Sequence, residues 1–282
     1  MKYLLIEKEI MLKNNVINLA KTATISAGLL LAQTSYVNAG VFEVIHPDVK
    51  KGEYELEFLN GANLDSVDDG EERSEHELAL GYSFTDNWKL TGAIEIANPA
   101  GESLEVEGFE LQSVYILPFS NGKKSAKGHD HNHNHEHAHG EDKHSGWTLG
   151  ILAALEIPEE DGFDEGAFEI GPIVEATFGP FLWVGNLVLE VPFGDEDPGL
   201  GFASQTIYPV TNSFGIGVES FGAFEELFGD GDEEELFAGP ALYFKAKIGN
   251  SVLEPRVAVL FGLNDETEDA ILSFNLEYKF GG

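Results

Sequence analysis

The chain of 282 residues contains no cysteine at all. Small exported domains usually depend on disulfides, and many structural zinc sites depend on thiolates, so both kinds of scaffold are excluded. A chain of this length can instead bury enough surface to be stable without covalent cross-links. The absence of cysteine therefore favours one large domain held together by backbone pairing and packing.

Basic residues are also scarce. Lys and Arg number 16 against 50 Asp and Glu, which leaves a formal net charge of −34. Such a charge repels the phosphate backbone of nucleic acids and attracts cations. A nucleic-acid partner is therefore excluded, and small solutes or metal ions are the expected partners.

Long apolar runs are missing after Ala39, where no window reaches the roughly 18 residues that a transmembrane helix needs. Before that point, Val16 to Ala32 is largely apolar, and Val37 and Ala39 have the spacing of a cleavage site. We therefore predict a signal peptide over residues 1–39, with Met11 as a candidate for the true start, and a periplasmic segment over residues 40–51. The mature chain is expected to be exported.

What the mature chain does contain is period-two alternation, seen most clearly in its last strand. From Ala270 to Phe280 one parity is apolar or aromatic and the other carries Ser, Asn, Glu and Lys. A strand presents alternate residues to opposite faces. This pattern suits either a soluble sandwich or a wall with lipid outside and water inside.

The number of segments and their connections favour the membrane wall. Twelve alternating segments begin near residues 52, 76, 88, 104, 147, 167, 181, 201, 213, 236, 252 and 270. Long acidic connections alternate with tight turns, as in outer-membrane barrels with long extracellular loops and short periplasmic turns. A soluble sandwich has no reason to sort its loops in this way. We predict an all-β protein, a single transmembrane antiparallel β-barrel of about 12 strands, over residues 52–280.

The polar parity of these segments is predicted to line the lumen. Its candidate residues are Glu53, Glu55, Glu57, Glu77, Glu95, Glu110, Glu156, Glu175, Glu190, Glu219, Glu254, Arg256, Glu277 and Lys279. Carboxylates around a pore favour cations or polar solutes. The same charges could also pair with one another and fill a narrow barrel. Both interpretations remain open at this point.

A histidine-rich tract lies between the fourth and fifth segments. It is predicted to be a flexible periplasmic loop over residues 119–146, with His129, His131, His133, His135, His137, His139 and His144 as candidate metal ligands. Neutral imidazole binds zinc, copper and nickel, so any of these metals is expected to bind here. No cofactor is required. The alternative is a soluble low-complexity insertion without a metal role.

Catalysis has little support in the sequence. Ser74 and His76 lie on the same parity of the second segment and form the one candidate nucleophile–base pair, without an assigned acid partner. Polarity at the rim of the barrel explains them more simply. No catalytic residue and no enzymatic activity are predicted.

Aromatic residues near the strand ends complete the pattern: Tyr54, Tyr82, Phe84, Trp88, Tyr115, Trp147, Phe178, Phe181, Phe244 and Tyr278. Together with the closing residues 275–280, they resemble Gram-negative outer-membrane β-barrel proteins, in particular an uncharacterised porin-like set. In that family a terminal aromatic residue helps the barrel assembly machinery recognise the last strand, whereas here Gly281 and Gly282 follow Phe280.

The resemblance implies a location in the outer membrane, with lipid and the assembly machinery as partners. Together with the charge pattern it favours a porin-like channel for small polar or cationic solutes, linked to zinc or copper handling through the histidine tract. The competing hypothesis is a non-conducting structural or metal-sequestering protein.

Overall fold

The computed structural model describes residues 42–64, 74–97, 104–118, 146–159, 166–194, 197–224, 234–264, 267 and 269–282. Residues 1–41 and 119–145 lie outside this part of the chain. The signal peptide and the histidine tract fall in these two stretches, and they therefore stay predictions.

The described residues form antiparallel strands wherever the alternation predicts them. These are β1 (Glu53–Asn63), β2 (Ser74–Ser83), β3 (Trp88–Ala97), β4 (Glu105–Ile116), β5 (Trp147–Pro158), β6 (Ala167–Phe178), β7 (Phe181–Pro192), β8 (Gly199–Thr211), β9 (Phe214–Phe224), β10 (Glu234–Phe244), β11 (Ala246–Ile248), β12 (Ser251–Gly262) and β13 (Ala270–Gly281). The short β11 continues β10 beyond an interruption at Lys245, and both pair with β12. The barrel therefore has twelve strands, as predicted.

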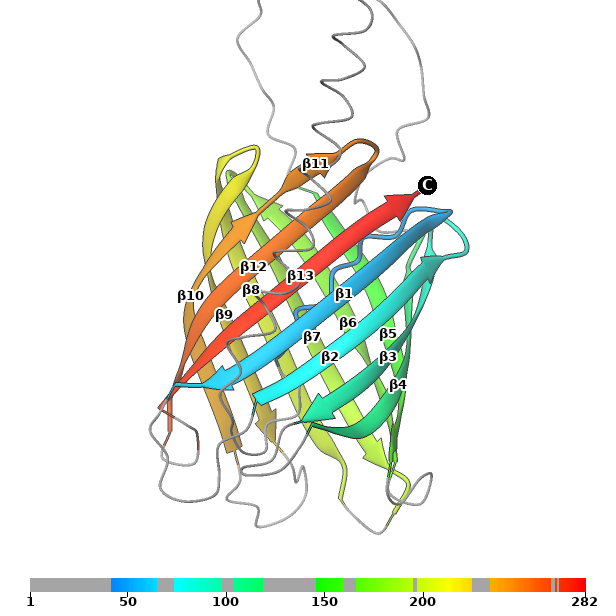
Figure 1. Ribbon diagram of the computed structural model, residues 1–282, viewed down its shortest axis with the longest axis vertical. Helices are drawn as coiled ribbons and strands as arrows, with labels where there is room; N and C mark the ends of the chain where they lie inside the picture. The colour runs from blue at the N-terminus through cyan, green and yellow to red at the C-terminus, as the bar shows by residue number, and fades with distance from the viewer. Residues whose placement is uncertain are drawn as a thin grey trace, which may run out of the picture.

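The sheet closes on itself, as Figure 1 shows from the side. With β11 counted as a continuation of β10, each strand pairs with its neighbours in sequence, and β13 pairs with β1. In that last pairing Tyr54 lies opposite Phe280 and Phe58 lies opposite Leu276. Closure pairs the backbone groups of every strand, which is the requirement for a sheet in lipid. The prediction that the last strand closes the barrel against the first is confirmed.

The two faces of the wall differ as the alternation predicts. On the outer face, large apolar side chains such as Leu80 and Phe109 are about half exposed, at 54% and 47%. Aromatic rings pack against one another there, with 4.7 Å between the ring centroids of Tyr54 and Tyr82 and 4.8 Å between those of Phe84 and Trp88. Such a belt of exposed aromatic residues is typical of a membrane interface.

The two ends of the barrel also differ. At one end, here the turn end, connections of two to four residues (84–87, 179–180, 212–213 and 249–250) join the strands, with the long connection 117–146 as the exception. At the other, the loop end, the connections between strands have six to ten residues. The predicted sorting of loops by length is confirmed. Both ends of the long connection, at β4 and β5, lie at the turn end.

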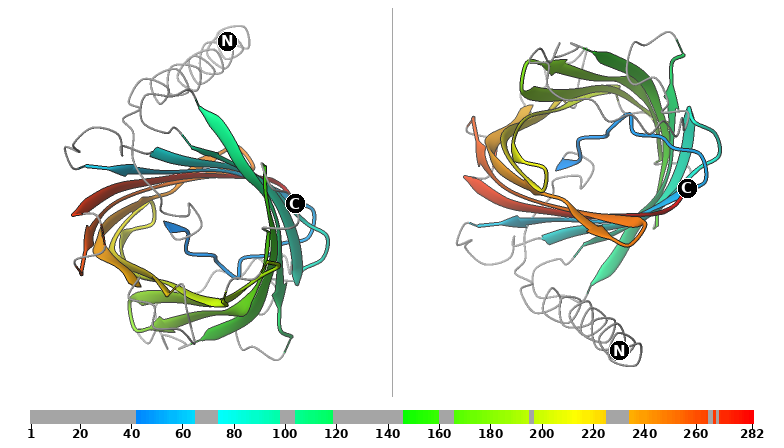
Figure 2. Two further views of the ribbon diagram at one scale, coloured as in Figure 1. Left: turned by 90° about the horizontal axis from the view of Figure 1, so that it is seen from below. Right: turned by 90° about the horizontal axis from the view of Figure 1, so that it is seen from above.

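Residues 42–50 form a luminal segment that runs inside the ring of strands, as the views along the barrel show (Figure 2). The prediction of a periplasmic segment over residues 40–51 did not anticipate this location, and its compartment stays a prediction. Among the described residues, no helix is long and apolar enough to cross a membrane.

Candidate functional site

The luminal segment is anchored at its first described residue, Phe42. Its ring packs edge-on against Phe221 and Phe237, with ring centroids 5.6 Å and 5.5 Å apart. Both partners are fully buried on the inner face of β9 and β10. Arg256 on β12 also donates a hydrogen bond of 3.1 Å to the Phe42 carbonyl oxygen. These contacts fill the β9–β12 side of the lumen with side chains.

A second anchor holds the middle of the luminal segment. The Ile45 N–H donates to the Asn186 side-chain oxygen at 2.8 Å, and the Asn186 amide donates to the Ile45 carbonyl at 2.9 Å. Asn186 therefore satisfies both backbone groups of a residue that has no strand partner. Buried backbone groups need such partners, because leaving one unpaired costs about 1–3 kcal/mol.

Glu43 carries a carboxylate into the lumen between the two anchors. Burial raises the pKa of Glu43 above its ordinary value, while Lys89, Arg256 and a hydrogen bond from Gln112 oppose the shift. The carboxylate also repels glutamates on β2, β4 and β6. Glu43 therefore lies between the basic and the acidic parts of the inner wall.

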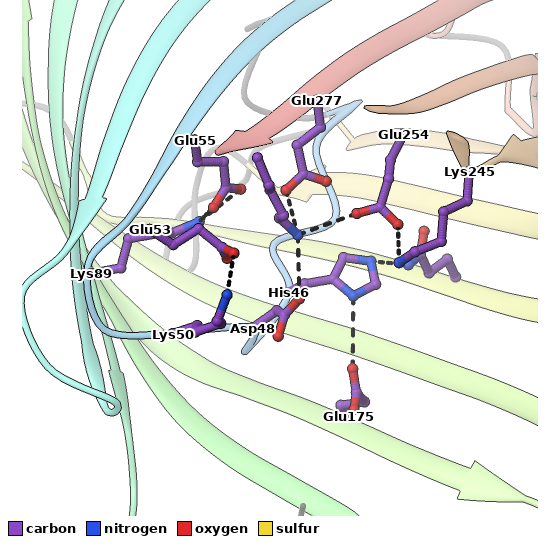
Figure 3. A network of polar contacts seen from close by, with 12 residues as sticks. His46, Asp48, Lys50, Glu53, Glu55, Lys89, Glu175, Lys245, Glu254 and Glu277 are labelled. Carbon is purple, nitrogen blue, oxygen red and sulfur yellow. Dashed lines mark hydrogen bonds and ion pairs between the residues drawn. The ribbon is translucent and has the colours of Figure 1, made fainter. Parts of the chain in front are cut away.

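An ion-pair network surrounds the luminal segment at the turn end (Figure 3). Lys279 is its centre, with its Nζ 2.6 Å from Glu277, 3.3 Å from Asp48 and 3.6 Å from Glu254. The remaining pairs are Lys245–Glu254 at 2.6 Å, Lys89–Glu55 at 3.1 Å, Lys50–Glu53 at 3.4 Å and His46–Glu175 at 3.8 Å. His46 also contacts Gln205. Most carboxylates at this end therefore have a basic partner.

A buried ion pair lies deeper in the lumen. Arg256 contacts Glu219 at 2.8 Å, and the Tyr243 hydroxyl donates to the other oxygen of Glu219 at 2.7 Å. Arg256 also donates to Ser273. Removing one member of such a pair leaves a buried charge without compensation, so the group acts as a unit.

Three carboxylates in this region approach the spacing of a metal site. One oxygen from each of Glu55, Glu57 and Glu277 lies within 4.8 Å of the others. Lys89 and Lys279 already neutralise two of the three, Glu55 and Glu277. Structural ion pairing explains the cluster without a metal.

A cavity of about 320 Å³ lies between the luminal segment and the inner wall, to which β1, β3, β6 to β10, β12 and β13 contribute. Its lining includes acidic, basic and uncharged polar side chains, among them Glu43, Glu175, Lys279, His46 and Tyr243. Pro209, residues 211–215 and residues 243–245 at the turn end contribute to it as well. The lumen is therefore narrowed here but not filled completely.

The inner wall of β2 to β7 near the loop end is different. It carries a carboxylate band, consisting of Glu77, Glu95, Glu110, Glu156, Glu169 and Glu190. Strand register brings these residues together, because Glu77 lies opposite Glu95, Glu110 opposite Glu156 and Glu169 opposite Glu190. Within the described part of the chain, no basic side chain lies within 4.0 Å of the first five carboxylates. Like charges at this spacing attract counter-cations.

All fourteen residues predicted to line the lumen lie on the inward parity of their strands, the parity of the buried side chains. The structure divides them between the ion-paired turn end, the deeper pair of Glu219 and Arg256, and the carboxylate band. That they line a conducting passage stays a prediction. The seven histidines of the tract lie outside the described residues.

Sequence reasoning missed Phe42, Glu43 and Asn186 as parts of the site. One signal was present, since Phe42 and Val44 alternate with Glu43 before the first strand. The contact between Phe42 and residues about 180 positions later, however, has no local signature. Ser74 and His76 lie on the outer face of β2, within hydrogen-bond distance of each other.

Solved structures of outer-membrane channels share this fold. The KdgM porin aligns with 80% of this chain and 99% of its own length, at 12% identity and a TM-score of 0.50. An outer-membrane channel from Pseudomonas putida F1 aligns with 88% of this chain and 100% of its own, at 12% identity and a TM-score of 0.52. No protein-family model and no curated protein matches the chain. The similarity therefore supports the barrel fold of an outer-membrane channel.

Proposed function

We propose that this barrel is a passive channel of the outer membrane that favours small cations and polar solutes. The carboxylate band carries the proposal. Five of its carboxylates have no basic side chain within 4.0 Å among the described residues, although the turn end pairs most of its charges. Carboxylates that line a water-filled opening raise the local concentration of cations and repel anions.

The luminal segment would set the width of the passage. Its Phe42 end packs against β9 and β10, and its Ile45 packs against β4, β5 and β6, so the segment crosses the lumen and solutes would pass beside it. A solute entering at the band would next meet Glu43 and the cavity at the turn end. A barrel of this size is only modestly wider than one filled by its own side chains, which favours small solutes.

The substrate class would differ from that of one structural neighbour. The KdgM porin has been solved in complex with oligogalacturonate, whose sugars carry carboxylates. In the present lumen such a polyanion would meet the carboxylate band and be repelled. Cationic or neutral polar solutes are therefore the proposed cargo.

Conductance in a planar bilayer tests this function. Purified barrels are placed in the bilayer under a KCl gradient. We expect stepwise changes of current from single channels, and a reversal potential whose sign indicates that K⁺ passes more readily than Cl⁻. The competing function is a closed structural protein. A flat trace at all salt concentrations would support that alternative, and a chloride preference would contradict the proposed role of the band.

We propose metal handling as a second function, through the histidine tract. One observation favours it: β4 and β5, which flank the tract, end at the turn end, where the cavity also lies. Imidazoles there could collect zinc, copper or nickel near the passage. Zinc titration of the barrel, with and without residues 128–144, is expected to show tighter binding by the intact chain. Equal affinities would contradict the metal role.

A further inference from the structure

The outer face of the wall carries a linked group of three polar side chains among its apolar residues. It consists of Asn60 on β1 with Ser74 and His76 on β2, all on the outward parity. Asn60 lies opposite Phe274 on one side and His76 on the other, and His76 lies opposite Ile96. Polar and ionisable side chains on a lipid-facing surface are costly, and they commonly mark a functional site.

The three side chains are linked in a definite order. The Ser74 Oγ lies 3.1 Å from the His76 Nε2, and the Asn60 amide nitrogen lies 2.9 Å from the His76 Nδ1. The imidazole ring also stacks on Phe58, with centroids 6.0 Å apart and planes 14° apart. A hydroxyl on one ring nitrogen and an amide on the other is the arrangement of a nucleophile, a general base and a positioning residue.

The location of the group within the wall indicates the substrate. Ser74 is the first residue of β2, and Asn60 lies three residues before the end of β1, both towards the loop end. Strand ends of a membrane barrel lie near the boundary between hydrocarbon and head groups. The acyl ester bonds of membrane lipids lie at this same boundary.

We propose that Ser74, His76 and Asn60 form a lipid-facing acyl-ester hydrolase site, separate from the lumen. The Ser74 Oγ attacks the ester carbonyl carbon and forms a C–O bond, while His76 Nε2 takes the hydroxyl proton. The bond to the alcohol then breaks, and His76 returns the proton to the departing oxygen. Water, activated by His76, releases the fatty acid from Ser74 in the same manner.

The orientation of the Asn60 amide determines which ring nitrogen of His76 carries the proton. With its amide nitrogen towards Nδ1, the proton of neutral His76 resides on Nε2 and points at Ser74. Base action requires the amide to turn by half a rotation, so that its oxygen accepts a hydrogen bond from a protonated Nδ1 and Nε2 is left as the free base. The Glu75 carbonyl, 3.3 Å from the amide nitrogen, favours the first orientation. An acceptor-only side chain at position 60 would remove this competition.

The side chains are covered, since Ser74 is 1% exposed and His76 is 6% exposed. Because the group lies on the outward parity, a reactive ester must approach it from the membrane side, after the atoms that cover Ser74 have moved, and the probe must be soluble in lipid. An alkyl fluorophosphonate meets this requirement and forms a stable bond to an activated serine hydroxyl.

The test is fluorophosphonate labelling of the full barrel in phospholipid vesicles, followed by mass analysis of the labelled peptide. We expect one adduct, on Ser74, and its loss in Ser74→Ala. Ser113→Ala is the matched control, because Ser113 is also on the outer face but is bonded to the Trp88 indole at 3.0 Å and not to a histidine. Labelling of this control should equal that of the natural chain. Absence of labelling, or labelling that survives Ser74→Ala, would overturn the proposal.

Two further variants distinguish chemistry from folding. His76→Ala should slow labelling by about 10² or more, the usual contribution of a general base. Asn60→Ala should also slow it, whereas Asn60→Asp should restore it, because a carboxylate accepts a hydrogen bond from the Nδ1–H group. The folding of each variant is checked first by gel electrophoresis of unheated samples, in which a folded barrel migrates as a compact species. Equal labelling of Asn60→Ala and Asn60→Asp would contradict the positioning role. Channel conductance should be unchanged throughout, so the test is independent of the lumen.

Discussion

The two ends of the lumen differ in whether their carboxylates are paired with basic side chains. At the turn end, Lys279 alone contacts three carboxylates, and further basic residues pair with most of the others. Near the loop end, five carboxylates of the band have no basic side chain within 4.0 Å among the described residues. The paired end holds the luminal segment in place. The unpaired end remains available to cations from outside the protein.

This difference separates structural charges from functional ones. Opposite charges that are close together cancel each other's field over a few ångströms, whereas a group of like charges acts over about the Debye length of 8–10 Å. Changes at the paired end should therefore alter stability and the width of the passage. Changes in the band should alter the selectivity for ions and leave stability nearly unchanged.

The largest expected effect is on stability, from Arg256→Ala. The substitution leaves the fully buried Glu219 without its ion-pair partner and removes a hydrogen bond to Phe42. Breaking a buried pair in this way costs about 3–5 kcal/mol. Urea unfolding of the barrel in vesicles should show the loss, with Lys50→Ala as an exposed control that changes little. Equal unfolding midpoints for the two variants would contradict the structural role of the deep pair.

The next effect concerns the anchor of the luminal segment. Phe42→Ala removes a buried ring from between Phe221 and Phe237 and should weaken the seating of the segment by about 3 kcal/mol. Single-channel conductance should rise, because the segment leaves the lumen more often. Phe178→Ala, on the outer face at the turn end, serves as the control. An unchanged conductance in Phe42→Ala would mean that the segment does not limit the passage.

A smaller effect is expected at the second anchor. Asn186→Ala removes both hydrogen bonds to Ile45, at a cost of about 1 kcal/mol for each bond, while Asn186→Asp keeps the acceptor for the Ile45 N–H. In bilayer recordings, opening events should be most frequent in Asn186→Ala, less frequent in Asn186→Asp and least frequent in the natural chain. Equal frequencies in all three would exclude this anchor from gating.

The smallest effect is a pH dependence that arises from Glu43. Its pKa is raised from the ordinary 4.5, so the seated segment is favoured below that pH and becomes less stable as the pH rises through the raised value. Conductance should therefore increase with pH over this range. Glu43→Gln should flatten the increase, because Lys89, Glu55, Arg256 and Gln112 then face a neutral side chain. An identical pH profile in the variant would assign the dependence to other groups.

The wall of the barrel could be predicted from the sequence because its rule is local. Leu272, Phe274 and Leu276 alternate with Ser273 and Asn275, and this period of two decides which face meets lipid whatever the rest of the chain does. The interruption at Lys245 was not predicted, since the apolar pattern continues on both sides of it. The starts of the strands were otherwise correct to within two residues, which is within the usual uncertainty of element boundaries.

The interior and the outer polar group could not be predicted because they depend on distant contacts. Phe42 meets Phe221 only after the barrel has closed. Asn60 meets His76 only in the register that the connection between β1 and β2 selects, and the sequence does not specify that register. The pair of Ser74 and His76 was visible on one parity, but its third member was not.

The reversal potential under a KCl gradient tests most directly the difference between the unpaired carboxylates of the band and the paired charges of the turn end. The natural chain should prefer K⁺, and Glu110→Gln with Glu169→Gln should move the potential towards zero. Removing a whole ion pair, with Lys50→Met and Glu53→Gln, should leave the potential unchanged because the net charge of the lumen stays the same. A natural chain that prefers chloride, or a band variant that retains the full K⁺ preference, would contradict the account.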